Sequence, residues 1–230
     1  MVSSTATARR KAQIMDQAFI PAVRSAIQAN ELGPASPYCL SYACLGNSGA
    51  SFGIFQGDTN VNARARDTLD NVLRAANVDD DARVRILDAV SRPCPGGNPL
   101  SPDDAERVND ALARSQGRDL VDQMDDGLMR GVLGYIDSSV DAAGRAGKTI
   151  DPEAQLYIAL WVNMTGAPDT LNRWLGGGTE MGMAPPDGPI VTVEDIKGYL
   201  QASKYFQENP RNFAHMEQSV AAGAKLLPRA

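Results

Sequence analysis

Apolar side chains recur at helical spacing along most of this chain. Over residues 8–31 they return at steps near four, and the Gly-Pro pair at 33–34 then ends the pattern, which predicts a helix that stops near residue 31. A longer stripe predicts a buried helix over residues 119–147, because its apolar positions lie four residues apart. These positions are Leu120, Met124, Leu128, Val132, Ile136 and Val140.

Further helices are predicted on both sides of that stripe. Acidic residues lie near the start of segments 79–91 and 101–115, where a helix dipole favours negative charge. Ser101 followed by Pro102 is typical of a helix start. The segment that begins at residue 151 is nearly all apolar in its middle, which predicts a core helix. The remaining predicted helices span residues 62–76, 167–178, 192–206 and 209–227.

One segment departs from helical spacing. Residues 37–57 combine β-forming side chains with turn glycines, which predicts a small β-hairpin region. The segment at 92–104 is rich in proline and glycine and is predicted to be a loop that could separate two lobes. We therefore expect a mainly α, α+β fold in which residues 1–230 form a single domain.

Composition and charge narrow the range of functions. The 230 residues carry a formal charge of −6, and the pI is about 4.8. A nucleic-acid partner is therefore not expected, because phosphate contacts need clusters of lysine and arginine. The chain has neither a GxxxxGK[ST] nor a GxGxxG motif, and no cofactor is predicted. Since no apolar run reaches about 18 residues, no membrane span is expected.

Cysteine and histidine are scarce in this sequence. Three cysteines without a CxxC motif and the single histidine, His215, make a poor metal site, so no metal is predicted. Cys39 and Cys44 could close a small bridge, although reduced structural thiols fit the sequence better. The chain has no GxSxG motif whose serine His215 could activate as a nucleophile, so His215 is expected at a surface or interface. The acid pairs at 103–104 and 125–126 are expected to be solvated.

Two carboxylates are the strongest candidates for chemistry. Cleavage of a glycosidic bond needs a proton donor and a second group that stabilises the cationic centre or activates water. Glu31 lies at the predicted end of the first helix, where the dipole disfavours negative charge and helps to keep a carboxyl protonated. Asp58 follows the predicted hairpin and is the second candidate. On position alone, an ordinary surface acid is the preferred interpretation of each.

Two segments resemble a known superfamily. "FGIFQGD" at 52–58 resembles the "FGLMQVD"-type segment of goose-type lysozymes and the "GLMQ" segment of lytic transglycosylases. "IALWVNMTGAPDTLNRWLGGG" at 158–178 resembles the "AAYNAGPGNVNRWL" segment of lytic transglycosylases. The two segments occur in the family's order, which implies a lysozyme-like helical fold around a small β-region.

The resemblance implies a role for individual residues. The acid of that superfamily is a glutamate that closes a helix before the β-region, which corresponds to Glu31, and Asp58 corresponds to the aspartate after "GLMQ". The continuation "ELGPASP" differs from the family's usual "ES". Gln56 is expected to line the cleft and Asn163 to contact sugar near the scissile bond. The predicted substrate-binding set is Ser51, Gln56, Trp161 and Asn163.

These expectations lead to three functional hypotheses. The first is an enzyme that cleaves the β-1,4 glycan strand of peptidoglycan, as a muramidase or a lytic transglycosylase. The second is a glycosidase on another amino-sugar polymer such as chitosan, because an acidic protein favours a cationic substrate. The third is a lysozyme-like module that has lost catalysis and only binds a glycan or a protein.

The first residues of the chain bear on its delivery. A basic cluster is present, but the apolar residues after it are interleaved with polar ones, which indicates an amphipathic helix and not a signal peptide. An enzyme made in the cytoplasm in this way would reach the cell wall by a phage-type route or a secretion system. An inhibitor or delivery partner is left open.

Overall fold

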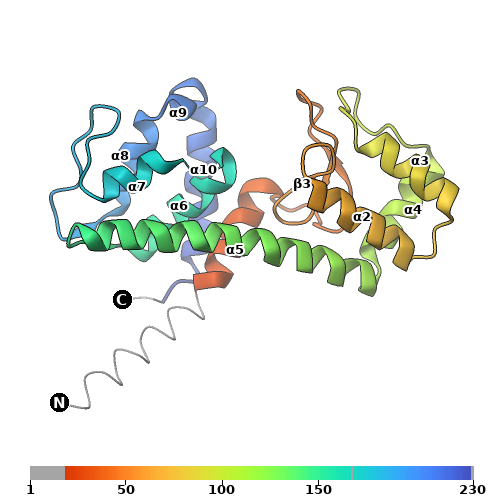
Figure 1. The fold of residues 1–230 in the computed structure, drawn as a ribbon, viewed down its shortest axis with the longest axis horizontal. Helices are drawn as coiled ribbons and strands as arrows, with labels where there is room; N and C mark the ends of the chain where they lie inside the picture. Colours follow the sequence, from red (N-terminus) through yellow and green to blue (C-terminus); the bar gives the residue numbers. More distant parts are fainter. Residues whose placement is uncertain (1–18, 167, 229–230) are drawn as a thin grey trace, which may run out of the picture. The chain divides into compact units, whose positions relative to one another are not determined.

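The computed structural model describes residues 19–166 and 168–228. It is mainly helical with a small three-stranded antiparallel sheet, so the predicted mainly α, α+β class is confirmed (Figure 1). The first predicted helix is described from residue 19 and ends at Glu31, as expected. Its earlier part, residues 8–18, lies outside the described residues.

The chain divides into two compact units. Unit 1 comprises the residues up to Asn30 together with those from Arg130 onward, and unit 2 comprises Glu31–Met129. Both divisions fall at helices: one at the end of the 19–31 helix, the other inside helix α5 (Ser115–Arg145). The loop at 92–104, which the sequence offered as a boundary between lobes, lies inside unit 2.

Unit 2 contains the predicted β-region. Strands β1 (Ser41–Tyr42), β2 (Ala50–Phe52) and β3 (Gly57–Asp58) pair antiparallel in that order. Ser51 of β2 is opposite Ser41 on one side and Asp58 on the other. The hairpin region is therefore present, and a third strand extends it to Asp58.

Two helices of unit 2 begin at side chains that cap them, and the cap at Ser101 was predicted. Asn62 caps α2 by accepting from the backbone N–H of Arg64, and Ser101 caps α4 with Pro102 at the first helical position. The helices that follow the sheet in Figure 1 are α2 (Ala63–Ala75), α3 (Asp80–Val90), α4 (Pro102–Ala113) and the first part of α5.

A single apolar cluster joins the sheet of unit 2 to its helices. The strands contribute the fully buried Ala50 and Phe52, and α5 contributes Val121 and Met124. The helices supply the rest of the cluster: Ala65, Leu69, Val72, Leu73, Ile86, Val90, Val108, Ala111 and Leu112. Because the sheet has few residues of its own, its position depends on this helical layer.

Asp104 departs from the expectation of a solvated acid at a helix start. Its residue is only 6 % exposed, and its carboxylate accepts from Arg85 Nε at 3.1 Å and Arg85 Nη2 at 3.0 Å. This hydrogen bond lowers the pKa of Asp104 from its usual range. The acid therefore ties α4 to α3 as an ion pair.

We expect Asp104→Asn to destabilise the protein by about 1.5–3 kcal/mol at pH 7, because a charge-assisted pair is lost. The pKa of Asp104 is lowered in the folded state, so its contribution is complete above the unfolded value of 3.8 and is lost as the pH falls through the folded value. Urea unfolding should show the gap between wild type and variant closing below about pH 4. Asp103→Asn, at the exposed neighbouring position, should change stability little at either pH; an equal effect would contradict the ion-pair explanation.

Unit 1 is built on the predicted apolar helix. In α6 (Pro152–Thr165) every residue from Leu156 to Val162 is buried, as the sequence predicted. A short parallel pair of strands, β4 (Thr149–Ile150) and β5 (Ile190–Val191), lies before α6 and before α8. The helices of this unit after α6 are α7 (Asp169–Leu175), α8 (Val193–Ala202), α9 (Lys204–Glu208) and α10 (Pro210–Ala224).

Two details of the helix prediction change in unit 1. The helix predicted over 192–206 is two helices, because the Ser203 hydroxyl accepts from the N–H of Phe206 and starts α9 after α8 has ended. The long stripe of α5 is buried at Met124, Val132 and Ile136, but Val140 near its end is 38 % exposed.

Among the described helices, none combines the length and the apolar character needed to cross a membrane.

Candidate functional site

The turn between β2 and β3 has a constrained backbone. Gly53 has a φ of +79° and Gln56 a φ of +48°, and the N–H of Gln56 donates to the Gly53 carbonyl at 3.2 Å. The side chains of Ile54 and Phe55 are buried. A non-glycine residue with positive φ is uncommon, so the conformation of Gln56 needs support from its surroundings.

Asp125 of α5 provides part of that support from beneath the turn. It is fully buried, and its Oδ2 accepts from the N–H of Ile54 at 2.9 Å. A Cβ on Gly53 would lie 2.6 Å from Asp125 Oδ1 and 2.8 Å from Met124 Cε. The expectation of a solvated acid at this position was wrong, because the Asp125 carboxylate is buried and accepts a hydrogen bond from the backbone of the turn.

The burial of Asp125 could have been predicted from the spacing of apolar residues around it. Asp125 is four residues after Val121 and four before Met129, and both of these side chains are buried. A second apolar stripe therefore runs along α5 beside the predicted one, with an acid at its centre. An acid on a buried helix face that meets a glycine turn is a candidate anchor for that turn.

Gln56 has its side chain fixed by two hydrogen bonds. Its Nε2 donates to the Gly53 carbonyl at 3.0 Å, and its Oε1 accepts from the hydroxyl of Ser41 on β1. The same Ser41 hydroxyl lies 3.3 Å from the Ser51 carbonyl. Ser51 itself is buried in β2. The amide therefore belongs to an ordered polar cluster of Ser41, Ser51 and Gln56 at one end of the sheet.

Asp58 connects the β1–β2 loop to the segment after β3 through hydrogen bonds. Its carboxylate accepts from the N–H of Gly49 at 3.1 Å and from the N–H of Asn60 at 2.7 Å. The Asn60 amide donates to the Asn47 carbonyl at 2.6 Å, and the buried Thr59 hydroxyl donates to the Val90 carbonyl at 2.6 Å. The "GDTN" segment thus ties the β1–β2 loop to β3 and to the end of α3.

We expect Asp58→Ala to destabilise unit 2 by about 1.5–3 kcal/mol, because backbone N–H groups lose a charged acceptor. Asp58→Asn retains one acceptor oxygen and should cost less. Urea unfolding followed by circular dichroism measures both. Equal stability of Asp58→Ala and wild type would show that the hydrogen bonds to Asp58 do not contribute to the stability of unit 2.

Glu31 occupies the predicted place at the end of its helix. It is partly exposed, ends the 19–31 helix and is followed by a turn that leads to β1. It is the first residue of unit 2, which also contains Asp58, Gln56 and Ser51. The order helix, acid, sheet that the sequence suggested is therefore present in the chain.

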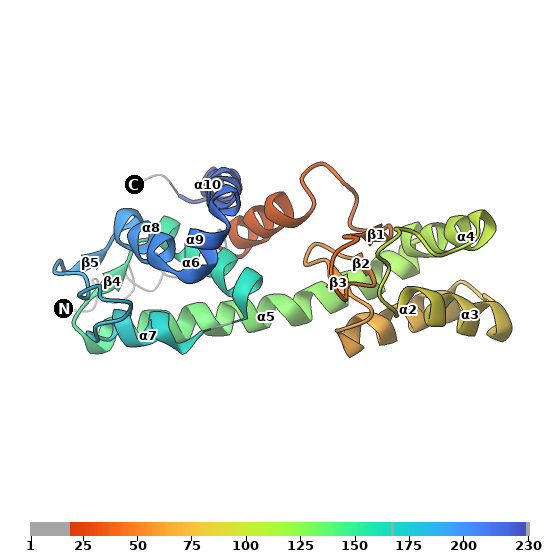
Figure 2. The ribbon, with the colours of Figure 1, turned by 90° about the horizontal axis from the view of Figure 1, so that it is seen from above.

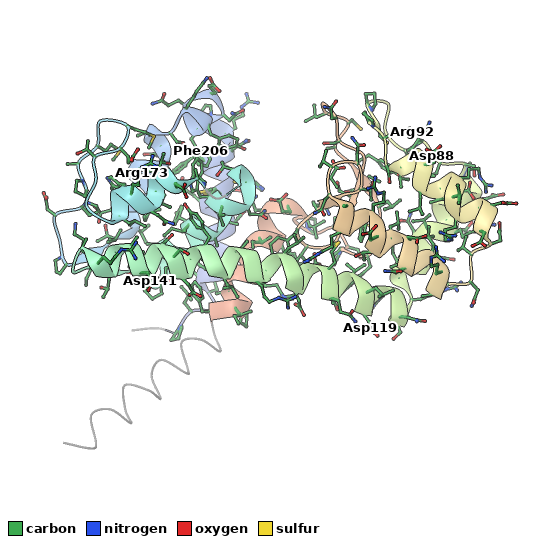
Figure 3. All side chains as sticks on the ribbon, viewed as in Figure 1. Asp88, Arg92, Asp119, Asp141, Arg173 and Phe206 are labelled. Carbon is green, nitrogen blue, oxygen red and sulfur yellow. The ribbon has the colours of Figure 1, made fainter. Side chains whose placement is uncertain are left out.

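Trp161 lies in the core of unit 1. It is 5 % exposed, and its ring contacts Tyr205 and Phe206, with centroids 6.2 and 5.6 Å away. Phe206 comes from α9 and is labelled in Figure 3. In this arrangement the Trp161 ring has no open face for a sugar. Asn163, also on α6, is half-buried.

The second segment of the resemblance folds as α6 and α7 and is held by polar contacts within unit 1. Asn172 accepts from the Ser139 hydroxyl of α5 at 2.7 Å, and the indole N–H of Trp174 donates to the Ala184 carbonyl at 2.8 Å. Arg173, also labelled in Figure 3, pairs with Glu180. These three residues of the segment therefore have packing roles in the structure.

Two groups near the sheet, the thiol of Cys94 and the phenol of Tyr42, are poor reactive groups at neutral pH. Cys39, Cys44 and Cys94 are all free thiols, and burial raises the pKa of Cys94. Burial also raises the pKa of Tyr42 on β1 to about 12, so its hydroxyl stays protonated at neutral pH. Within residues 19–166 and 168–228, no group of three or more histidine, cysteine or acidic side chains is placed to hold a metal ion.

The chain matches no known family model, no curated protein and no solved structure in the comparisons.

Proposed function

We propose that this protein cleaves the β-1,4 glycan strand of peptidoglycan, as a muramidase or a lytic transglycosylase. One observation carries the proposal. A helix ends on Glu31 and leads into a three-stranded sheet, whose β2–β3 turn fixes the Gln56 amide with Gly53 and Ser41. This is the arrangement that the resemblance to lysozyme-like enzymes implies.

In this proposal Glu31 protonates the leaving oxygen of the glycosidic bond. A general acid must be protonated near neutral pH before it can act. The C-terminal end of a helix disfavours negative charge, and Glu31 is the last residue of its helix. Its partly exposed position also leaves it accessible to a polymeric substrate.

Gln56 is proposed to bind the sugar next to the cleaved bond. An amide offers both a donor and an acceptor to hydroxyl and N-acetyl groups. The hydrogen bonds to Gly53 and Ser41 hold the amide in one orientation before substrate arrives, which lowers the entropy lost on binding. Ser51, the other predicted sugar contact of this sheet, is buried in β2, and its carbonyl lies 3.3 Å from the same Ser41 hydroxyl. Asn163 and the buried Trp161, which the resemblance also implicates in sugar binding, both belong to α6 of unit 1.

Asp58 distinguishes the two forms of the reaction. A hydrolase would use it as the second carboxylate, to position water or stabilise charge, whereas in a transglycosylase the sugar's own hydroxyl attacks. The Asp58 carboxylate already accepts from the N–H groups of Gly49 and Asn60. This engagement favours the form that depends less on Asp58, which is transglycosylation.

Product analysis tests the proposed function. Purified protein is incubated with insoluble peptidoglycan and, in parallel, with chitosan, and the soluble products are examined by mass spectrometry. Reducing ends from peptidoglycan support a muramidase, and 1,6-anhydro ends support a transglycosylase. Cleavage of chitosan alone would replace the substrate with a cationic amino-sugar polymer. No product from either polymer would contradict the enzyme assignment and leave a binding module.

A further inference from the structure

The only histidine of the sequence contacts the helix that ends on Glu31. His215 of α10 has its Nε2 at 2.9 Å from the carbonyl oxygen of Asn30, the residue directly before Glu31. A carbonyl oxygen can only accept, so the His215 ring must carry a proton on Nε2. Both residues belong to unit 1.

This contact is one end of a longer helix-helix interface. A Cβ on Gly223 of α10 would lie 3.0 Å from the Cβ of Ala26 and would also meet the carbonyl of Ala22. Moving from Gly223 back to His215 corresponds to moving forward from Ala22 to Asn30, so the two helices run antiparallel. The two helices lie beside each other in Figures 1 and 2. Close packing at Gly223 fixes the axes, and His215 meets the end of the 19–31 helix.

A donor at this place has a physical role. The last carbonyls of a helix lack partners within the helix, and positive charge or N–H groups near them are stabilising. The His215 N–H supplies a partner to the Asn30 carbonyl from a separate element. It therefore restrains the final turn of the helix, because helix ends tend to fray.

We propose that His215 is a positioning residue that holds the helix end carrying Glu31. This inference rests on the proposed function, in which Glu31 is the general acid. The His215 side chain is exposed and contacts the backbone of Asn30, directly before Glu31, so in this proposal it acts on the orientation of the acid and not on the substrate.

Three variants test the inference. His215→Ala removes the donor, and His215→Gln replaces the imidazole Nε2 with an amide Nε2 that can reach the same carbonyl. Gln218→Ala, at an exposed position of the same helix, is the matched control. Because the exchanged side chains are exposed, we expect all three proteins to fold, and thermal unfolding verifies this.

Hydrogen exchange provides a readout that does not depend on activity. We expect exchange at the backbone amides of residues 28–33 to be about five-fold faster in His215→Ala, because one hydrogen bond at the helix end is lost. It should return to the wild-type rate in His215→Gln and be unchanged in Gln218→Ala. Unchanged exchange in His215→Ala would overturn the inference.

Kinetic measurements on peptidoglycan then distinguish a role of His215 in positioning Glu31 from a role in stabilising the helix end alone. We expect kcat of His215→Ala to fall about 10- to 100-fold with little change in KM, and His215→Gln to recover most of it, because misplacing a catalytic group affects the chemical step. Faster exchange with an unchanged kcat would make His215 a structural cap and overturn the positioning role. An inactive wild type would instead identify the proposed function as the failure, and the positioning role would fall with it.

Discussion

Glu31→Gln should reduce glycan cleavage by about 10²–10⁴-fold while leaving the fold intact. Glutamine has nearly the same shape as glutamic acid but has no carboxyl proton to give to the leaving oxygen. The effect should appear in kcat, because proton donation contributes to the transition state more than to substrate binding. Release of soluble products from peptidoglycan measures it.

The matched control is Glu208→Gln. Glu208 is an exposed glutamate at the end of α9 that pairs with Lys204 one helical turn earlier, and such surface pairs contribute little to stability. This variant should retain wild-type activity and thermal stability. If Glu31→Gln cleaves peptidoglycan as fast as Glu208→Gln, Glu31 is not the acid, whatever the products are.

The second large effect concerns stability and comes from Gly53→Ala. An alanine there must keep a φ of +79° and place its Cβ 2.6 Å from Asp125 Oδ1. The backbone conformation costs about 1–2 kcal/mol, and overpacking against α5 costs about 1–3 kcal/mol more. We expect a total loss of about 2–5 kcal/mol, measured by urea unfolding.

Comparison with Gly46→Ala separates the steric part of this loss from the conformational part. Gly46 also has a positive φ, +54°, but a Cβ there would meet no atom within 4 Å. It should cost only the conformational part, about 1–2 kcal/mol. Equal losses in the two variants would show that the close approach of α5 to the turn adds nothing. Since this turn carries Gln56, Gly53→Ala should also raise KM for peptidoglycan, whereas Gly46→Ala should not.

The helices were largely predictable because their signals are local. The apolar step of four along α5, the acids and caps at the starts of α3 and α4, and the apolar run of α6 all act within one or two helical turns. The extra boundary at Ser203 was missed because a serine cap can interrupt an otherwise continuous apolar pattern.

The candidate site was predictable only in part. The position of Glu31 at a helix end and the place of Gln56 in a tight turn could be predicted from neighbouring residues. The burial of Trp161 could not, because it depends on Tyr205 and Phe206, which follow more than 40 residues later. The sequence also did not show that the Asp58 carboxylate accepts from the N–H of Gly49, because that contact depends on how the β1–β2 loop folds over β3.

The sequence by itself determined the helical class, the small β-region, the acidic charge and the candidates for chemistry, because these follow from composition and short-range periodicity. Only the tertiary structure decided which acids are buried and which groups they contact: Asp104 contacts Arg85, and Asp125 contacts the turn at Gly53. It also decided that the exposed His215 contacts the end of the helix that carries Glu31. Burial of a polar group requires a partner, and these partners come from segments distant in the chain. Their identity is therefore fixed by packing and not by local pattern.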